Sequence, residues 1–208
     1  MRWLGSLEQV GSAPASAGLP ERLSQWLDWT DASALSTALN AAPAQPTTPA
    51  IKTRARSPHH ACEQVRLALA QSIDQDGALR EETAKVDRAE RPSFAPYRAH
   101  CRAQQRKMEA RIDALRTDVR AALAAQSADL AQLASLDAVM AQALSARTQH
   151  LLSTLPDLLE QQFNRLPADQ RTGFCQQVRS VLHAELDMRL QPIAGLLEAL
   201  GPAPAQHP

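Results

Sequence analysis

The residues best suited to chemistry are two short clusters of histidine and cysteine. His59 and His60 lie close to Cys62, and His100 directly precedes Cys101. Imidazole nitrogens and thiolates are the usual ligands of zinc, so two such clusters could in principle form one site. However, consecutive histidines point in different directions on a helix, and neither cluster has the ligand spacing of a known zinc motif. We therefore predict no metal and no cofactor, and we interpret the isolated cysteines as small apolar residues.

A second candidate is the pair of His183 and Asp187, which are one helical turn apart. A carboxylate at this spacing can orient a histidine that acts as a general base. The same spacing is common in surface pairs that only stabilise a helix. The sequence also lacks a nucleophile in a strained strand-to-helix turn, a glycine-rich phosphate loop and an H-E-x-x-H motif. We therefore predict no catalytic residues and a protein that is not an enzyme.

Any of these residues must be positioned by helices, because the composition provides little that forms strands. Alanine, leucine, arginine and glutamine dominate the 208 residues, while aromatic residues make up only 3% and there are seven glycines. Scarcity of β-branched and aromatic residues is atypical of a sheet, so we predict an all-α fold. Lys+Arg and Asp+Glu both number 22, so no global field attracts the chain to polyanions.

The cysteine pattern bears on the compartment of the protein. Cys62, Cys101 and Cys175 are odd in number and widely spaced, which argues against a disulfide framework and favours a reducing compartment. The first eighteen residues lack the apolar run of a signal peptide. No stretch approaches the roughly 20 apolar residues of a membrane-spanning helix. We therefore predict a cytoplasmic protein without membrane insertion.

Prolines and glycines divide the chain. We expect a short N-terminal helical module at 1–40, in which Pro20 begins one helix and Asp31 caps a second. Residues 41–58 contain four prolines and no apolar period, which predicts a flexible linker. A bundle of long helices is expected at 59–201, and a disordered tail at 202–208.

Within the predicted bundle, helix ends are marked by single residues. Pro58 is a credible helix start, and a period of three and four residues then runs to Ile73. Pro156 should kink or restart a helix, and Pro192 should kink the last one before Gly201 ends it.

The most regular pattern begins after Tyr97. Residues at alternating spacings of four and three predict a coiled-coil seam of about three heptads: Cys101, Gln105, Met108, Ile112, Leu115, Val119 and Ala122. We take Met108, Ile112, Leu115 and Val119 as the centre of an assembly seam, through which we expect the chain to self-associate. A closed bundle within one chain is the alternative.

Charge distinguishes this helix from the next. Basic residues dominate 98–120, whereas acidic residues dominate 127–163. This asymmetry predicts an antiparallel hairpin in which the acidic flank meets the basic flank. A basic helix can also bind nucleic acid. The zero net charge, the interleaved acids and the absence of a recognition-helix motif argue against that alternative.

Two tryptophans in the stretch QWLDW are the last candidate site. Leu23, Trp26 and Leu27 span about 100° of one helix face, and Trp29 lies about 60° beyond Trp26. Both rings could anchor the short helices on the bundle, since aromatic side chains bury large areas. Alternatively, these four residues form a docking element, because tryptophan is typical of binding hot spots.

Three stretches carry a resemblance to a known family: QWLDWTDASALSTALN, FAPYRAHCRAQQRKMEARIDALR and AELDMRLQPIAGLLEAL. They resemble a proteobacterial family catalogued as a domain of unknown function. The resemblance implies a cytoplasmic helical protein without an assigned activity. It also implies a gene neighbourhood of envelope proteins of the stator-like and peptidoglycan-binding kinds.

Taken together, the patterns predict a non-enzymatic cytoplasmic helical adaptor or scaffold. Its protein partner would be a second copy of the chain or an envelope-associated protein. The alternative is a regulator that binds nucleic acid through the basic helix at 98–120.

Overall fold

The computed structural model describes residues 29–40, 57–75, 93–167 and 173–201. These residues form helices and no strands, which confirms the all-α prediction. The predicted helix around Leu23, most of the predicted linker and the predicted tail lie outside the described residues. The helices are α2 (Trp29–Asn40), α3 (Pro58–Asp74), α5 (Ala95–Ala124), α6 (Ala128–Ser153), α7 (Leu155–Arg165) and α8 (Phe174–Leu200).

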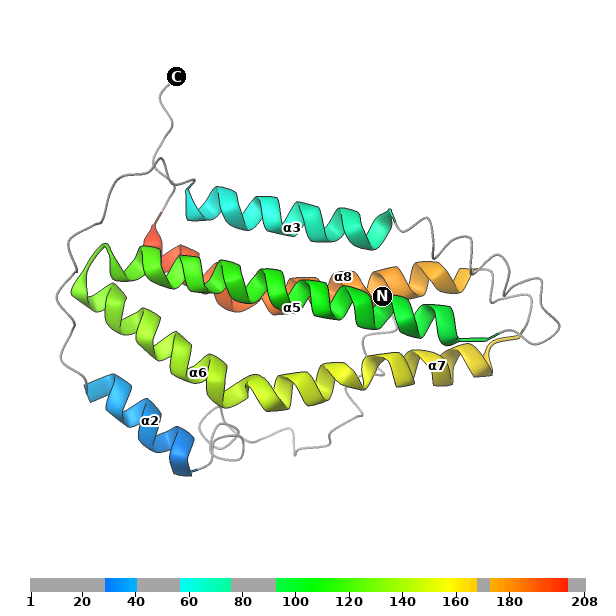
Figure 1. The fold of residues 1–208 in the computed structure, drawn as a ribbon, viewed down its shortest axis with the longest axis horizontal. Helices are drawn as coiled ribbons and strands as arrows, with labels where there is room; N and C mark the ends of the chain where they lie inside the picture. The colour runs from blue at the N-terminus through cyan, green and yellow to red at the C-terminus, as the bar shows by residue number, and fades with distance from the viewer. Residues whose placement is uncertain (1–28, 41–56, 76–92, 168–172, 202–208) are drawn as a thin grey trace, which may run out of the picture.

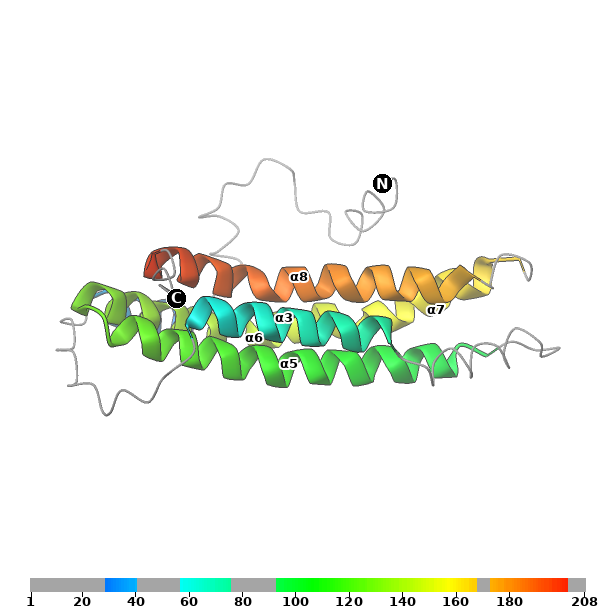
Figure 2. The same cartoon turned by 90° about the horizontal axis from the view of Figure 1, so that it is seen from above.

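The long helices form an up-down-up-down bundle. In Figure 1, α3 and the α6–α7 pair run in one direction, whereas α5 and α8 run in the other. The parallel helices α5 and α8 lie side by side, as Figure 2 also shows, and both pack against α3. The α6–α7 pair lies on the opposite side of α5 from α3, so α5 is the central helix of the fold.

Proline and glycine set several of the helix ends, as the sequence predicted. Pro58 is the first residue of α3, so the bundle begins at the last residue of the predicted linker. Pro156 is the second residue of α7, and Thr154 separates α7 from α6. Gly201 ends α8 with a φ of 80°, a conformation in which a Cβ atom would be strained. Pro192 lies inside α8, on its exposed side.

The buried stripe of α5 repeats every eleven residues, which corrects the predicted heptad. Gln104 and Leu123 are buried where the heptad pattern placed Gln105 and Ala122, which are only partly buried. The buried positions include Tyr97, Cys101, Gln104, Met108, Ile112, Leu115, Val119 and Leu123. Eleven residues make three turns of about 3.67 residues, close to the natural pitch, so α5 can remain straight while it faces one core.

A glutamine explains part of this shift in register. The buried side chain of Gln104 accepts a hydrogen bond from Ser72 Oγ at 3.1 Å and donates one to the Ser72 carbonyl at 3.0 Å. An apolar residue could not satisfy these α3 groups, and an unpaired buried polar group costs about 1–3 kcal/mol. Gln104 therefore fixes the position of α3 along α5.

A second glutamine joins three helices at the α6–α7 break. Pro156 has no N–H to donate to the carbonyl of Leu152, four residues earlier. Gln105 donates its Nε2 group to that carbonyl at 2.9 Å and to the Glu185 carboxylate of α8 at 3.0 Å. Glu185, which is buried, also accepts from Arg189. The partly buried Gln105 is therefore a polar joint between α5, α6 and α8.

Four aromatic rings close the end of the bundle where α5 begins, α7 ends and α8 begins. Phe94, Tyr97, Phe163 and Phe174 are all buried, and the centroids of every pair lie 5.2–6.2 Å apart. Tilted and edge-to-face geometries dominate, which suits the quadrupoles of the rings. The cluster connects three helix ends that are far apart in sequence.

The described part of the N-terminal module lies against the bundle. α2 packs on α6, on the outer side of the molecule in Figure 1. Gln132 of α6 donates a hydrogen bond to the Leu39 carbonyl at 2.8 Å. Asp31 lies in the first turn of α2, two residues after its first residue, and the helix ends at Asn40. α6 therefore contacts α5 on one side and α2 on another.

Candidate interaction surface

The histidine and cysteine clusters have structural partners instead of a metal geometry. His59 contacts the Gly201 carbonyl at 2.8 Å, which joins the start of α3 to the end of α8. His60 contacts Gln64 within α3 at 3.0 Å. Among the residues that the structure describes, no three His, Cys, Asp or Glu side chains gather in a group able to hold a metal ion.

The structure pairs His183 with Asp74 of α3, and not with the expected Asp187. His183 contacts Asp74 of α3 at 2.8 Å, so its carboxylate partner comes from another helix. Asp187 is exposed on α8. The interhelical contact was not predictable from spacing, because Asp74 is 109 positions away in the sequence. The arrangement joins α3 to α8.

The buried thiol of Cys101 is a poor nucleophile. Burial, followed by the nearby Glu185 carboxylate, raises the pKa of Cys101 to about 12. Burial and the adjacent Glu63 also raise the pKa of Cys62 above its ordinary value. Since the thiolate is the reactive form, the raised pKa lowers the reactivity of both thiols, and that of Cys101 most. Cys62, Cys101 and Cys175 are all free.

The four residues at the centre of the predicted assembly seam lie inside the chain's own core. Met108, Ile112, Leu115 and Val119 are at most 5% exposed and belong to one cluster with residues of α3, α6, α7 and α8. The chain's own helices therefore cover this seam, instead of the second copy that the sequence predicted.

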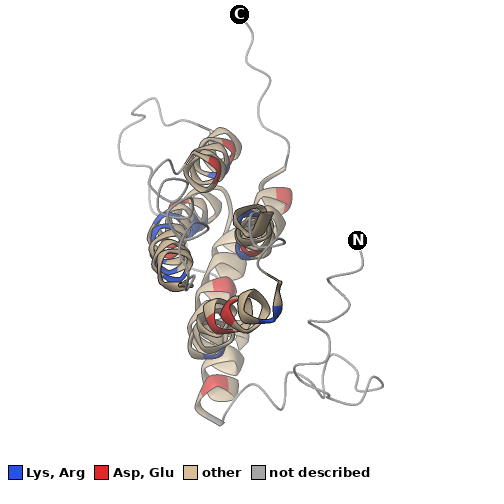
Figure 3. Cartoon of the chain, turned by 90° about the vertical axis from the view of Figure 1, so that its right-hand side faces the viewer, with Lys and Arg blue, Asp and Glu red and all other residues tan. Residues whose placement is uncertain are grey.

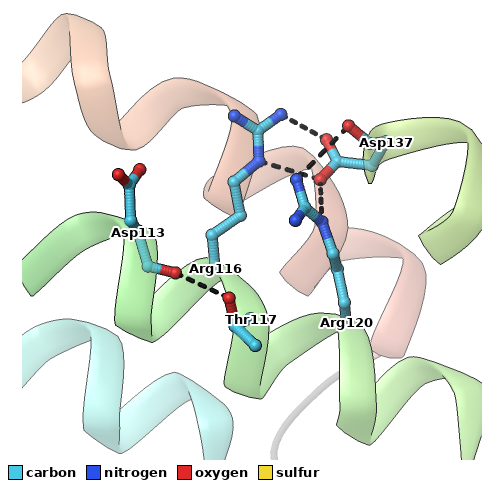
Figure 4. Close-up of polar contacts among 5 residues, drawn as sticks. All are labelled: Asp113, Arg116, Thr117, Arg120 and Asp137. Carbon is cyan, nitrogen blue, oxygen red and sulfur yellow. Dashed lines mark hydrogen bonds and ion pairs between the residues drawn. The ribbon is translucent and has the colours of Figure 1, made fainter. Parts of the chain in front are cut away.

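Ion pairs join the basic helix to the acidic one, as the charge asymmetry predicted. Asp137 of α6 accepts from Arg116 Nη2 at 2.5 Å and Nε at 2.8 Å, and from Arg120 Nε at 2.7 Å (Figure 4). Burial alone would raise the pKa of Asp137, but the two guanidinium groups outweigh it and hold the pKa below its ordinary value. Two cations face one carboxylate, so this site is satisfied within the chain.

A second ion pair fixes α5 to α7. Arg98 donates to Asp157 at 2.5 Å and also to Glu160. Its guanidinium lies 5.8 Å from the centre of the Phe94 ring. Hydrogen bonding to Asp157 raises the pKa of Arg98 above its ordinary value.

The remaining cations of α5 are spread over its outer side. They are exposed and form no ion pair with another described residue. These cations are Arg102, Arg106, Lys107 and Arg111. Lys107 instead donates to Ser72 Oγ. Figure 3, which looks along the helices, shows basic and acidic residues distributed around the bundle. Among the described residues, cations and carboxylates therefore occur together around the bundle.

Exposed apolar residues mark the edge formed by α2 and α6, which we call the α2–α6 edge. Among the described residues, the large apolar side chains most exposed to solvent are Leu39, Leu67, Leu133, Leu151 and Met188, and three of these five lie on α2 or α6. Leu133 follows Gln132, the residue that contacts Leu39. α6 buries only Ala134 and Leu152 fully, although α5 and α8 each bury nine residues. α6 is therefore the least buried of the three longest helices.

Of the four predicted docking residues, Leu23, Trp26 and Leu27 lie outside the described residues. Trp29 is the first residue of α2, and only its backbone is described. The structure thus places the end of the tryptophan stretch at the α2–α6 edge. The sequence does not reveal this edge, because the exposure of the α6 residues depends on which other helices pack against them.

These features define an all-α bundle protein with a polar joint in its centre and an apolar edge. Within the described residues, no helix combines the length and apolar character that crossing a bilayer requires. The chain belongs to the family of proteins of unknown function DUF3348, whose sequence pattern matches residues 1–173 and 171–202. No curated protein and no solved structure matches the chain.

Proposed function

We propose that the chain is a non-enzymatic helical adaptor or scaffold of the cytoplasm that binds a protein partner at the α2–α6 edge. The observation that supports this most is the exposure of Leu39 and Leu133 beside the point where α2 contacts α6. Exposed apolar residues that gather at one edge are typical of interaction sites, whereas single ones elsewhere need no explanation. The free thiols fit a reducing compartment.

The partner's surface should be an apolar helix face or groove. α2 and α6 are two neighbouring helices, and a third amphipathic helix fits such a pair through residues at spacings of three and four. Tryptophan at this edge would supply the rigid ring that most often dominates binding energy. The partner class is an envelope-associated protein or a second copy of the chain.

Affinity isolation with the full-length chain tests the proposal. Leu39→Asp and Leu133→Asp place charges at the α2–α6 edge, and Leu67→Asp places one on α3 at similar exposure to Leu39 (53% and 54%). A partner retained by the parent chain and by Leu67→Asp, but lost with both edge variants, supports the adaptor function. If the parent chain and all three variants retain the partner equally, the α2–α6 edge is not the binding site.

The alternative is nucleic-acid binding through α5. The observation that favours it is the set of exposed cations between Arg102 and Arg111. Against it, Arg98, Arg116 and Arg120 already contact carboxylates of the chain. A titration of random duplex DNA at increasing salt separates the two functions, because phosphate binding weakens steeply as counterions compete. Affinity that falls by orders of magnitude between 50 and 200 mM salt, as about six phosphate contacts would give, supports the alternative.

A further inference from the structure

We propose that the outer face of α5 binds a second copy of the chain, with the two α5 helices side by side and antiparallel. The observation that carries this proposal is the order of exposed charges along α5, which complement those of a second copy. The surface differs from the α2–α6 edge, so the dimer goes beyond the proposed adaptor function and does not depend on it.

The outer face of α5 is the side turned away from the core. In Figure 2, α5 forms one margin of the bundle and α8 forms the opposite margin. Exposed residues recur on this side of α5 with the same eleven-residue repeat as the buried stripe. They are Ala99, Ala103, Arg106, Ala110, Ala114, Thr117 and Ala121. All of them are exposed, so the described helices leave this face uncovered.

Small side chains at the centre of this face allow a second helix to approach closely. Five of the seven residues are alanine. The distance between packed helix axes depends on the side chains at the contact, and alanine favours the short end of the range, about 8 Å. Exposed alanine does not identify a partner, because alanine also favours a solvated helix. The charges beside the alanines do.

The exposed charges of this face change sign along α5. In chain order they are Arg102, Arg106, Lys107, Arg111, Asp113 and Asp118. None of them forms an ion pair with another described residue. Glu109 contacts Gln149 of α6, and Arg116 and Arg120 bind Asp137 of α6. The outer face is therefore basic in its first part and acidic in its second part.

Such a face complements itself only in the antiparallel direction. A parallel copy in register would place cations beside cations. In an antiparallel pair with two-fold symmetry, residues on one side of the alanines face the same side of the other helix. Lys107 and Asp118 share one side, because the eleven residues between them complete three turns. Arg106 and Asp113, which are seven residues apart, share the other side.

A single two-fold axis near Arg111 serves both kinds of contact. Asp113 of the partner subunit would lie level with position 109, three positions from Arg106. Asp118 of the partner subunit would lie level with position 104, three positions from Lys107. Three positions are about 4.5 Å along the helix, which long basic side chains can span. Because the symmetry repeats each contact, the dimer has four pairs of opposite charges.

Sedimentation equilibrium of the full chain at micromolar concentration tests the proposal, and the parent chain should form a dimer. Arg106→Glu with Lys107→Glu makes the face acidic throughout, whereas Asp113→Lys with Asp118→Lys makes it basic throughout. Each double variant should raise the dissociation constant of the dimer by about tenfold or more, because four attractive contacts become repulsive. An equimolar mixture of the two should restore a dimer with one chain of each kind, which native mass spectrometry identifies.

Two single substitutions complete the experiment. Asp187→Lys is the matched control, since it reverses an exposed carboxylate on α8, the helix at the opposite margin. It should form the dimer as the parent chain does. Ala110→Arg keeps every paired charge and places a large cation close to its own copy near the axis, so it should also yield a monomer. If a charge reversal lowers the unfolding temperature of the chain, Ala110→Arg decides the outcome.

A parent chain that remains monomeric throughout the micromolar range would overturn the proposal. A dimer that Ala110→Arg and both double variants retain would also overturn it. The same holds for double variants that unfold at the parent's temperature but form no mixed dimer. A dimer that is lost with Leu39→Asp and retained by Ala110→Arg would place the second copy at the α2–α6 edge. That result would refute the α5 dimer and leave the proposed function standing.

Discussion

Replacing Asp137 with asparagine removes the one charge that holds two arginines of α5 against α6. Its carboxylate receives three guanidinium N–H bonds at 2.5, 2.7 and 2.8 Å, and only 12% of the side chain is exposed. Asparagine preserves the shape of the side chain but can accept only through one oxygen. Arg116 and Arg120 would then face each other without a counter-charge.

The expected loss of unfolding free energy follows from the partial burial of Asp137 and its two arginines. Hydrogen bonds to charged groups contribute about 1.5–3 kcal/mol each. The two arginine side chains are 20% and 22% exposed, so they can recover part of this energy by turning to water. We therefore expect Asp137→Asn to lower the free energy of unfolding by about 2 kcal/mol at pH 7. Urea unfolding followed by circular dichroism measures this change as a shifted midpoint at constant slope.

The stability that Asp137 contributes should decrease as the pH is lowered. The folded-state pKa of Asp137 is below its ordinary value, so its contribution to stability is complete above the unfolded-state pKa of about 3.9. It is lost as the pH falls through the folded-state pKa, whereas asparagine does not titrate. The difference between the two chains should therefore narrow below about pH 4.

Asp113→Asn is the matched control, because it removes the same charge from an exposed position on α5 beside the cluster in Figure 4. The Asp113 group that accepts a hydrogen bond from Thr117 is its backbone carbonyl, which the substitution preserves. Equal effects of the two substitutions, or a difference between parent and Asp137→Asn that persists unchanged at pH 3, would refute the reasoning.

Three further predictions concern Gln105, Cys101 and Phe163. Gln105→Leu leaves the Leu152 carbonyl without its side-chain donor and should lower the unfolding free energy by about 1–3 kcal/mol, measured by urea unfolding. Cys101 should react with iodoacetamide far more slowly in the folded chain than the other two cysteines, as peptide mass spectrometry of the labelled chain would show, because its thiol is buried and its pKa is about 12. Phe163→Ala should cost about 3–5 kcal/mol, since it removes one of four rings in contact; a loss below 1 kcal/mol in thermal unfolding would contradict a close-packed cluster.

Local signals predicted the fold class and several helix ends. Pro58, Pro156 and Gly201 act through their own backbone chemistry, so their effects do not depend on distant residues. Charge asymmetry likewise predicted which helices pair, because opposite charges in Arg116 and Asp137 lie on consecutive helices.

Non-local contacts could not be predicted in the same way. A heptad and an eleven-residue repeat both alternate steps of three and four, and here they differ at Gln104 against Gln105 and at Leu123 against Ala122. The choice between the two glutamines depends on Ser72 of α3, which only the packed structure reveals. Spacing alone pairs His183 with Asp187, one helical turn away, whereas folding brings Asp74 of α3 to 2.8 Å from it. The aromatic cluster combines residues 80 positions apart, from Phe94 to Phe174, so no window of sequence contains it.

The most direct test of the adaptor function compares binding and stability in the same variants. Once a partner has been isolated with the full chain, Trp26→Ala and Trp29→Ala should each weaken its binding by about 2 kcal/mol or more in titration calorimetry, the range of hot-spot residues. Neither should shift the thermal unfolding midpoint of the chain. A fall in stability of about 3–5 kcal/mol with unchanged partner affinity would contradict the account, because the tryptophans would then belong to the core.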